Sequence, residues 1–90
     1  MECKHSQAVT QRLARIAGQV SGIRDMVEEG RSCNDLLIQL SSVSSALTQV
    51  ARLIMSEHLE HCVYTGFDAG DTEQTVSELK KALEQFSKMK

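Results

Sequence analysis

The stretch RSCNDLLIQLSSVSSALTQVARLIMSEHLEHCVYT, residues 31–65, decides the fold of this chain, because it contains neither proline nor glycine. Gly30 precedes it and Gly66 follows it, so a residue that disfavours helix stands at each end. Its apolar residues recur at alternating steps of four and three, the spacing of one stripe on an α-helix, at Leu36, Leu40, Val43, Leu47, Val50 and Ile54, and after a slip at Leu59 and Val63. The stretch therefore predicts one unusually long helix, over residues 32–64.

Both ends of this predicted helix carry side chains that bind metals. Cys33 stands at its start, and His58 and Cys62 lie one turn apart near its end, where they can reach the same ion. The 25 positions from Cys33 to His58 span roughly 37 Å along a continuous helix. A second copy of the helix, packed antiparallel, would bring its own Cys33 beside His58 and Cys62. We therefore expect a homodimer with two equivalent sites, each built from both subunits.

The donor types narrow the choice of metal. Thiolate and imidazole together select soft or borderline ions, namely Cu(I), Zn(II), Ni(II) and Co(II). Two thiolates and one imidazole form a three-coordinate set that suits Cu(I), whereas structural zinc takes four protein ligands. A histidine and a cysteine four residues apart are, taken alone, more often a core thiol beside a solvent-facing imidazole. The presence of Cys33 at the opposite end of the same helix favours the metal site.

Two further helices are predicted, which makes the chain a single all-α domain over 1–90 with a flexible tail at 1–7 and a loop at 65–71. The first, at 8–29, has apolar residues at the alternating steps of a heptad, Val9, Leu13, Ile16, Val20, Ile23 and Val27. Ser6 is its expected cap. Gly18 and Gly22 lie inside it at a cost of about 1 kcal/mol each relative to alanine, which favours close approach of another backbone or of a phosphate chain. The second, at 72–88, is expected to open with an Asp71–Gln74 capping box.

Composition limits the class of protein. The 90 residues include no Trp, one Tyr and two Phe, so the core of a monomer is small and an oligomer is favoured. The net charge of −2 neither indicates nor excludes nucleic-acid binding. Three cysteines and a first segment without a secretory pattern predict a cytoplasmic protein, and no apolar run could span a membrane. No nucleophile–base pair, phosphate loop or HExxH motif is present, so we expect neither an enzyme nor a small organic substrate.

Four blocks of sequence carry a likeness to known proteins: RLARIAGQVSGI at 12–23, Cys33, QLSSVSSAL at 39–47 and HLEHCV at 58–63. Together they closely resemble the CsoR/RcnR family of small, all-helical bacterial transcriptional repressors, over nearly the whole chain. The set Cys33, His58 and Cys62 is similar to that of the family's copper sensors. The resemblance implies a dimer of antiparallel helices that assembles into a dimer-of-dimers tetramer, binds operator DNA without metal and releases it when Cu(I) binds.

The resemblance also implies roles for residues outside the ligand set. Arg12 matches an arginine of the family's DNA-contacting face, and Arg15 and Arg52 are the nearest further basic residues. Glu78 falls where the copper sensors place a carboxylate that hydrogen-bonds the ligand histidine. Ser32 departs from the family, whose copper sensors commonly have a tyrosine before the first ligand cysteine. The hydroxyl of Ser32 reaches less far from the backbone than that of a tyrosine.

Alternatives to a copper-responsive repressor remain open at this point. The family's nickel and cobalt sensors add N-terminal ligands, for which Cys3 and His5 are the candidates here, although residues in such a tail are more often simply solvated. Cys33 and Cys62 of facing subunits could instead form a thiol switch for reactive sulfur species. A helical oligomerisation module or a metal buffer without a DNA partner is a different class that would share the same helices.

Overall fold

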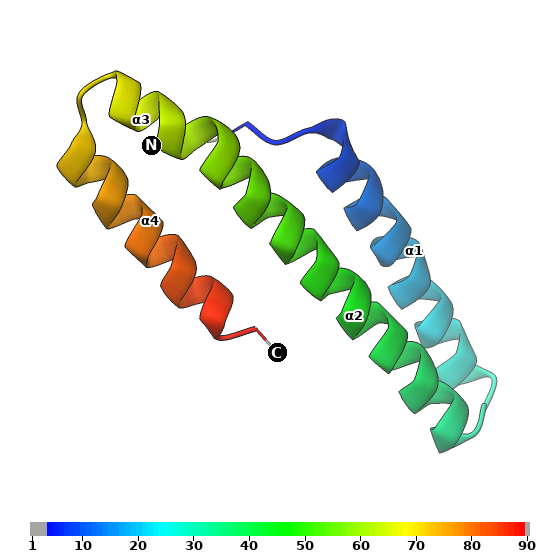
Figure 1. The fold of residues 1–90 in the computed structure, drawn as a ribbon. Helices are drawn as coiled ribbons and strands as arrows, with labels where there is room; N and C mark the ends of the chain where they lie inside the picture. Colours follow the sequence, from blue (N-terminus) through cyan, green and yellow to red (C-terminus); the bar gives the residue numbers. More distant parts are fainter. Residues whose placement is uncertain (1–3, 90) are drawn as a thin grey trace. The chain divides into compact units, whose positions relative to one another are not determined.

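The computed structural model describes residues 4–89, and this part of the chain is helical, without strands. The elements are α1 (Gln7–Glu28), α2 (Cys33–Glu57), the π-helix η1 (His58–Val63), α3 (Tyr64–Asp68) and α4 (Thr72–Ser87) (Figure 1). α2, η1 and α3 follow one another without interruption and form the long central helix. The predicted all-α class with three helical segments is therefore confirmed.

The π-helix lies where the apolar stripe slips. Ile54 and Leu59 are separated by a step of five, and η1 begins between them at His58. A π-helix hydrogen-bonds from residue i to i+5 and so accommodates one more residue per turn than the regular spacing allows. The π-helix therefore absorbs the extra residue, and the helix continues with its apolar stripe on the same side. Val63, the last residue of the stripe, is buried.

Two glycines close helices with the same hydrogen-bond pattern. Gly30 has a φ of 76°, and the N–H groups of Gly30 and Arg31 donate to the carbonyls of Val27 and Met26 at 3.1 and 3.0 Å. This is a Schellman motif, for which glycine is favoured because the left-handed conformation costs it nothing. Gly70, with a φ of 82°, closes α3 in the same way through the carbonyls of Phe67 and Gly66.

The N-terminal ends of α2 and α4 are capped differently. Ser32 Oγ accepts the backbone N–H of Asp35 at 3.1 Å, which makes Ser32 the cap of α2 and Cys33 its first residue. The expected capping box at Asp71 is wrong, since the Asp71 side chain makes no cap hydrogen bond. Gln74 Nε2 donates instead to Glu78 Oε1 within α4, at 3.0 Å.

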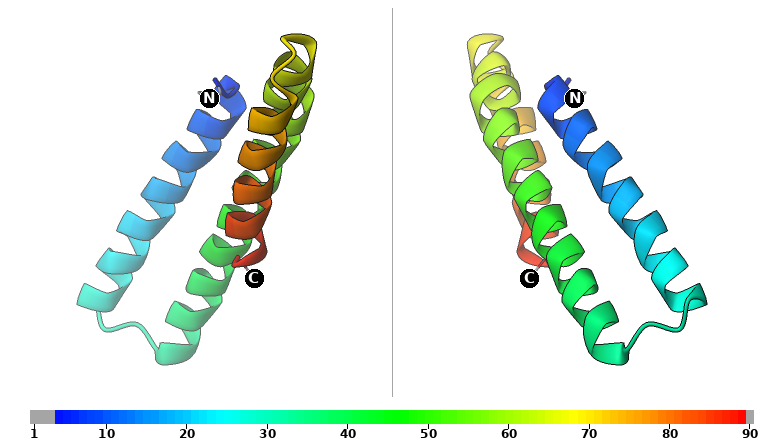
Figure 2. Two further views of the ribbon diagram at one scale, coloured as in Figure 1. Left: turned by 90° about the vertical axis from the view of Figure 1, so that its left-hand side faces the viewer. Right: turned by 90° about the vertical axis from the view of Figure 1, so that its right-hand side faces the viewer.

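The chain divides into two compact units, one comprising Gln7–Val50 and the other combining the segment before α1 with the chain from Ala51 onward. In the first unit α1 and the beginning of α2 form an antiparallel hairpin (Figure 2). Its buried apolar residues are seven apart on each helix, at Val9, Ile16, Ile23, Val43 and Val50. The intervening members of the two stripes are 40–57% exposed, at Leu13, Val20, Val27, Leu40 and Leu47. One chain therefore covers only half of its own apolar stripes.

In the second unit α4 folds back and packs against η1 and α3. The buried residues of this unit are Cys62, Val63, Gly66 and Thr75. The loop expected at 65–71 begins only at Ala69, because Gly66 is a position of close packing against Thr75 inside a helix rather than a helix end. An apolar hollow of about 290 Å³ lies between the last turns of α2 and α4, lined by Ala51, Ile54, Met55, Ala82, Gln85, Phe86 and Met89.

None of the helices in the described residues has the length and apolar character that a membrane crossing requires.

Candidate metal centre

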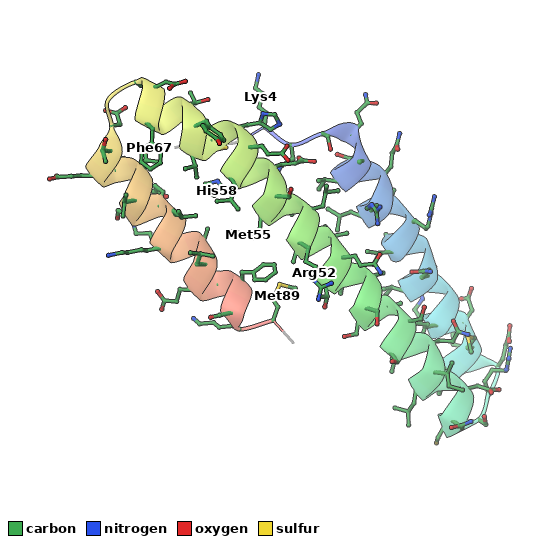
Figure 3. The ribbon with its side chains drawn as sticks, viewed as in Figure 1. Lys4, Arg52, Met55, His58, Phe67 and Met89 are labelled. Atoms are coloured by element: carbon green, nitrogen blue, oxygen red, sulfur yellow. The ribbon has the colours of Figure 1, made fainter. Side chains whose placement is uncertain are left out.

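His58 and Cys62 both lie on η1, the widened turn of the central helix. Cys62 is buried, with 9% of its surface exposed, and His58 is half-buried with its Nε2 atom shielded from solvent. Figure 3 shows His58 on the side of the helix that faces α4. Cys62 is disulfide-bonded in this structure. When Cys62 is reduced, its thiolate and the imidazole of His58 come from successive turns of one helix, which is an arrangement that can chelate a single soft ion.

Cys33 occupies a different part of the fold. It is the first residue of α2, and its thiol is free and exposed. α2 is a continuous helix of 25 residues, and His58 follows directly after its last residue. No cluster of three histidine, cysteine or carboxylate side chains with metal-binding geometry forms among residues 4–89 of one chain. The structure brings His58 and Cys62 together on one helix and leaves Cys33 on the surface.

Glu78, the carboxylate expected near the ligand histidine, lies on α4, which packs against η1. Its side chain is 28% exposed. Glu78 Oε1 accepts a hydrogen bond from Gln74 Nε2 at 3.0 Å, and Lys81 Nζ is 4.0 Å from the same oxygen. The carboxylate is therefore held on its own helix by neighbours one turn away on each side.

The three candidate DNA-contacting residues are all exposed. Arg12 and Arg15 lie on α1, three residues apart, so their guanidinium groups leave the helix on neighbouring sides. Arg52 lies on α2, in the part that belongs to the unit from Ala51 onward, whereas Arg12 and Arg15 belong to the unit Gln7–Val50. None of the salt bridges found in the described residues involves these arginines.

The sequence did not predict a set of contacts between the N-terminal segment and the end of α2, which we call the N-terminal clasp: His5, Ser6 and Glu57. Glu57 Oε1 lies 3.0 Å from His5 Nδ1 and accepts the backbone N–H of Ser6 at 2.9 Å. Glu57 Oε2 accepts the hydroxyl of Ser6 at 2.5 Å. Hydrogen bonds from the Ser6 hydroxyl, from the Ser6 backbone and from His5 hold the pKa of Glu57 below its usual value, against the opposing effect of desolvation.

The clasp changes what the sequence indicated for these residues. The Ser6 hydroxyl, expected to cap the first helix, donates to Glu57, which was expected to be solvated. His5 and Glu57 stand 52 positions apart, and no local pattern in the sequence links them. Cys3, the other N-terminal candidate ligand, lies outside the described residues. His61 is exposed and lies 3.9 Å from Glu60, in agreement with its expected place at the surface.

Comparison with known proteins shows the family to which this chain belongs. The model of the family described as metal-sensitive transcriptional repressor matches residues 5–85 of the chain. The chain belongs to this family, the CsoR/RcnR family. It is a metal-sensitive transcriptional repressor, as the four sequence blocks indicated.

Individual members of the family show how far the likeness extends. The copper-sensing transcriptional repressor CsoR of Bacillus subtilis is 44% identical over 85 residues, which cover 94% of this chain and 84% of that protein. The structure of the copper-sensing repressor CsoR with Cu(I) from Geobacillus thermodenitrificans matches with a TM-score of 0.86 at 37% identity, over 97% of this chain and 94% of that one. The nickel-responsive transcriptional regulator InrS matches with a TM-score of 0.79 at 40% identity, over 96% and 97%.

Proposed function

We propose that this metal-sensitive repressor responds to Cu(I), and that the ion is held by Cys33 of one chain together with His58 and Cys62 of another. The observation that carries the proposal is the donor set itself. Cys62 and His58 lie one turn apart on η1, and the Cys33 thiol stands exposed at the start of α2. Residues 4–89 of one chain contain no group of three donors that could hold a metal ion. Two thiolates and an imidazole make a three-coordinate site, which favours Cu(I).

The assembly that completes such a site is an antiparallel dimer, and two dimers then form a tetramer. The exposed members of the apolar stripes support it, because five large side chains on α1 and α2 remain 40–57% exposed in one chain, namely Leu13, Val20, Val27, Leu40 and Leu47. Burying them against a second copy would contribute about 25 cal/mol per Å² of apolar surface. Antiparallel pairing of the central helices would at the same time bring Cys33 of one chain to His58 and Cys62 of the other.

Operator DNA is the proposed partner, and Arg12, Arg15 and Arg52 are the proposed contacts. All three are exposed and take part in none of the salt bridges found in the described residues. Arginine contacts to phosphate provide affinity that falls steeply with salt, while base contacts and DNA shape select the sequence. A tetramer presents each arginine four times, so the local basic surface is repeated although each chain has a net charge of −2.

Glu78 is the proposed link between the metal centre and the rest of the subunit. A carboxylate that accepts the second ring N–H of a ligand histidine fixes the tautomer that coordinates. Because α4 packs directly on η1, a change in the orientation of His58 would be transmitted to α4 through such a bond. The coupling free energy required for 100-fold weaker DNA binding is only about 3 kcal/mol.

A second candidate is a Ni(II) or Co(II) sensor that adds Cys3 or His5 to the ligand set. The observation that favours it is the match to the nickel-responsive regulator InrS at 40% identity over 96% of this chain. These ions commonly take four to six ligands, so the three donors of the copper site would not be sufficient.

The test begins with DNA selected from a random-sequence duplex pool by the metal-free protein. Fluorescence anisotropy then measures its affinity with and without Cu(I) under anaerobic conditions. The wild-type protein should release the DNA when loaded with Cu(I), and the His58→Ala variant should bind it equally well but fail to release it. His61→Ala is the matched control, because it removes an exposed imidazole of the same turn and should release like the wild type. Release by His58→Ala would show that His58 has no part in the response.

A further inference from the structure

The cysteines of the chain are in different chemical states. Cys62 is disulfide-bonded and buried, with 9% of its surface exposed, whereas the Cys33 thiol is free and exposed. Cys33 is therefore not the partner of Cys62. The sequence contains one further cysteine, Cys3, which lies outside the described residues. Cys3 is thus the remaining candidate for the partner of Cys62 within one chain.

The sequence neighbours of Cys3 and Cys62 lie in the same part of the described structure. Lys4 follows Cys3 directly, and His61 precedes Cys62 directly. Lys4 and His61 line one hollow, whose other walls include the three residues of the N-terminal clasp. The segment before α1 therefore lies against the part of the central helix that leads into Cys62.

The clasp limits how far a bond between the two cysteines would have to reach. Glu57 Oε1 lies 3.0 Å from His5 Nδ1 and accepts the backbone N–H of Ser6 at 2.9 Å. Cys62 follows Glu57 by five positions, which correspond to about 7 Å of rise along a helix. Cys3 precedes His5 by two positions, and two extended residues also span about 7 Å. The chain before the clasp is thus long enough to bring the two sulfurs together.

We propose that Cys3 and Cys62 form a reversible disulfide, which the N-terminal clasp favours by holding the segment before α1 against the end of α2. The bond forms by exchange with a low-molecular-weight disulfide such as oxidised glutathione. One cysteine thiolate attacks that disulfide and releases a small thiol, and the other cysteine attacks the resulting mixed disulfide and releases the second. The net reaction breaks one S–S bond and forms another, and the released thiols carry the two electrons and two protons that the cysteines lose.

The bond would regulate the metal response, and this step rests on the proposed function. A cysteine binds a metal ion as its thiolate, and a disulfide sulfur has no such charge. The oxidised protein would therefore lack one of the three proposed copper donors and remain on operator DNA in the presence of Cu(I). Disulfides in reducing compartments are usually transient and redox-sensing, which favours a regulatory bond over a structural one.

Peptide mapping decides whether the bond forms. The full-length protein is equilibrated in glutathione buffers of increasing oxidised fraction, acid stops the exchange, the remaining thiols are alkylated and trypsin digests the protein without reduction. Lysine and arginine residues between the cysteines place each of them on its own peptide. A linked pair of peptides containing Cys3 and Cys62 is expected from the wild type and from Cys33→Ser, and none from Cys3→Ser. A bond from Cys62 to Cys33, a covalent dimer, or no bond to Cys62 would overturn the proposal.

The role of the clasp is tested by the ratio of oxidised to squared reduced glutathione at half oxidation. Glu57→Ala should require a ratio at least about threefold higher than the wild type, because loss of the clasp lowers the effective concentration of the two thiols. Ser6→Ala leaves α2 untouched and should shift the ratio less, in the same direction. Glu60→Ala is the matched control, because it removes the same charge from the same hollow, and should match the wild type. Equal ratios in all four proteins would overturn the role of the clasp.

An anaerobic Cu(I) titration separates this proposal from the proposed function, once fractions with a glutathione adduct have been removed. The oxidised wild type should bind Cu(I) at least about tenfold more weakly than the reduced protein. Cys3→Ser taken through the same oxidation should bind like the reduced wild type, because Cys62 keeps its thiol. If the reduced wild type does not bind Cu(I), the copper-sensing function is wrong, while the peptide map still decides the disulfide. Equal Cu(I) binding by the reduced and the mapped oxidised protein would show that the bond does not regulate the metal response.

Discussion

Gly66 and Thr75 approach so closely that a β-carbon on Gly66 would lie 3.0 Å from both Cβ and Cγ2 of Thr75. Gly66 lies on α3, Thr75 on α4, and both are buried. A glycine within a helix is normally unfavourable, so its presence here is explained by the space that α4 occupies. This contact sets how closely α4 packs on the helix that carries His58 and Cys62.

We predict that Gly66→Ala destabilises the protein by about 1–3 kcal/mol, because the added methyl group overpacks the contact. Urea unfolding at fixed protein concentration measures the change. Adding Thr75→Ala removes Oγ1 and Cγ2, two of the three Thr75 atoms that the added methyl group would meet, and should recover a large part of the loss. The two substitutions should therefore be strongly non-additive. Additive effects would show that the contact between Gly66 and Thr75 does not limit the packing of α4.

Thr75 itself allows a stabilising substitution. Its side chain is only 1% exposed, and its hydroxyl oxygen has no hydrogen-bond partner among the described residues. A buried polar group without a partner costs about 1–3 kcal/mol of desolvation free energy. Thr75→Val replaces the hydroxyl by a methyl group of similar size and should raise the free energy of unfolding by about 1 kcal/mol. An unchanged or lower stability would mean that the hydroxyl is satisfied by water.

The proposed division of the metal centre between two chains predicts complementation. Cys33→Ala and His58→Ala should each lower the Cu(I) affinity at least about tenfold when present on every chain. A mixed dimer, prepared by co-expression with two different affinity tags, would contain one complete site, with Cys33 from the His58→Ala chain and the ligand pair from the other. It should bind one Cu(I) tightly per dimer. A site built within a single chain would instead give no tight binding in any of the three proteins.

Periodicity predicted most of the fold. The stripe from Leu36 to Ile54 predicted a continuous helix, and Gly30 ends α1 as expected. The step of five after Ile54 was noted only as a slip, and the structure shows a π-helix there. These features depend on residues a few positions apart, which a sequence shows directly. The heptad pattern on α1 identified the apolar residues of the helix. It did not show which of them are buried within one chain, because burial depends on which helix packs against each position.

The features that the sequence did not predict depend on distant contacts. Gly66 was expected to end a helix, since the local rule for glycine does not include the position of Thr75 on another helix. Glu57 was expected to be a solvated carboxylate, because its partners His5 and Ser6 lie more than 50 positions away in the sequence. The proposed ligand set of Cys33, His58 and Cys62 could be inferred from residue type and spacing, but no contact within one chain could show how the three residues meet, because the proposed site includes a second chain.

The proposed DNA contact of Arg12 predicts a change in salt dependence rather than in sequence preference. Each phosphate contact releases counterions, so its loss lowers the slope of log affinity against log salt by about one unit. Arg12→Ala should therefore weaken binding of the metal-free protein to selected and unrelated duplexes by similar factors and reduce the slope. Arg24→Ala is the control, because it removes the same charge from an exposed position on α1, a third of a turn away around the helix. Equal effects of both substitutions would assign the change to the net charge of the protein and exclude a specific contact by Arg12.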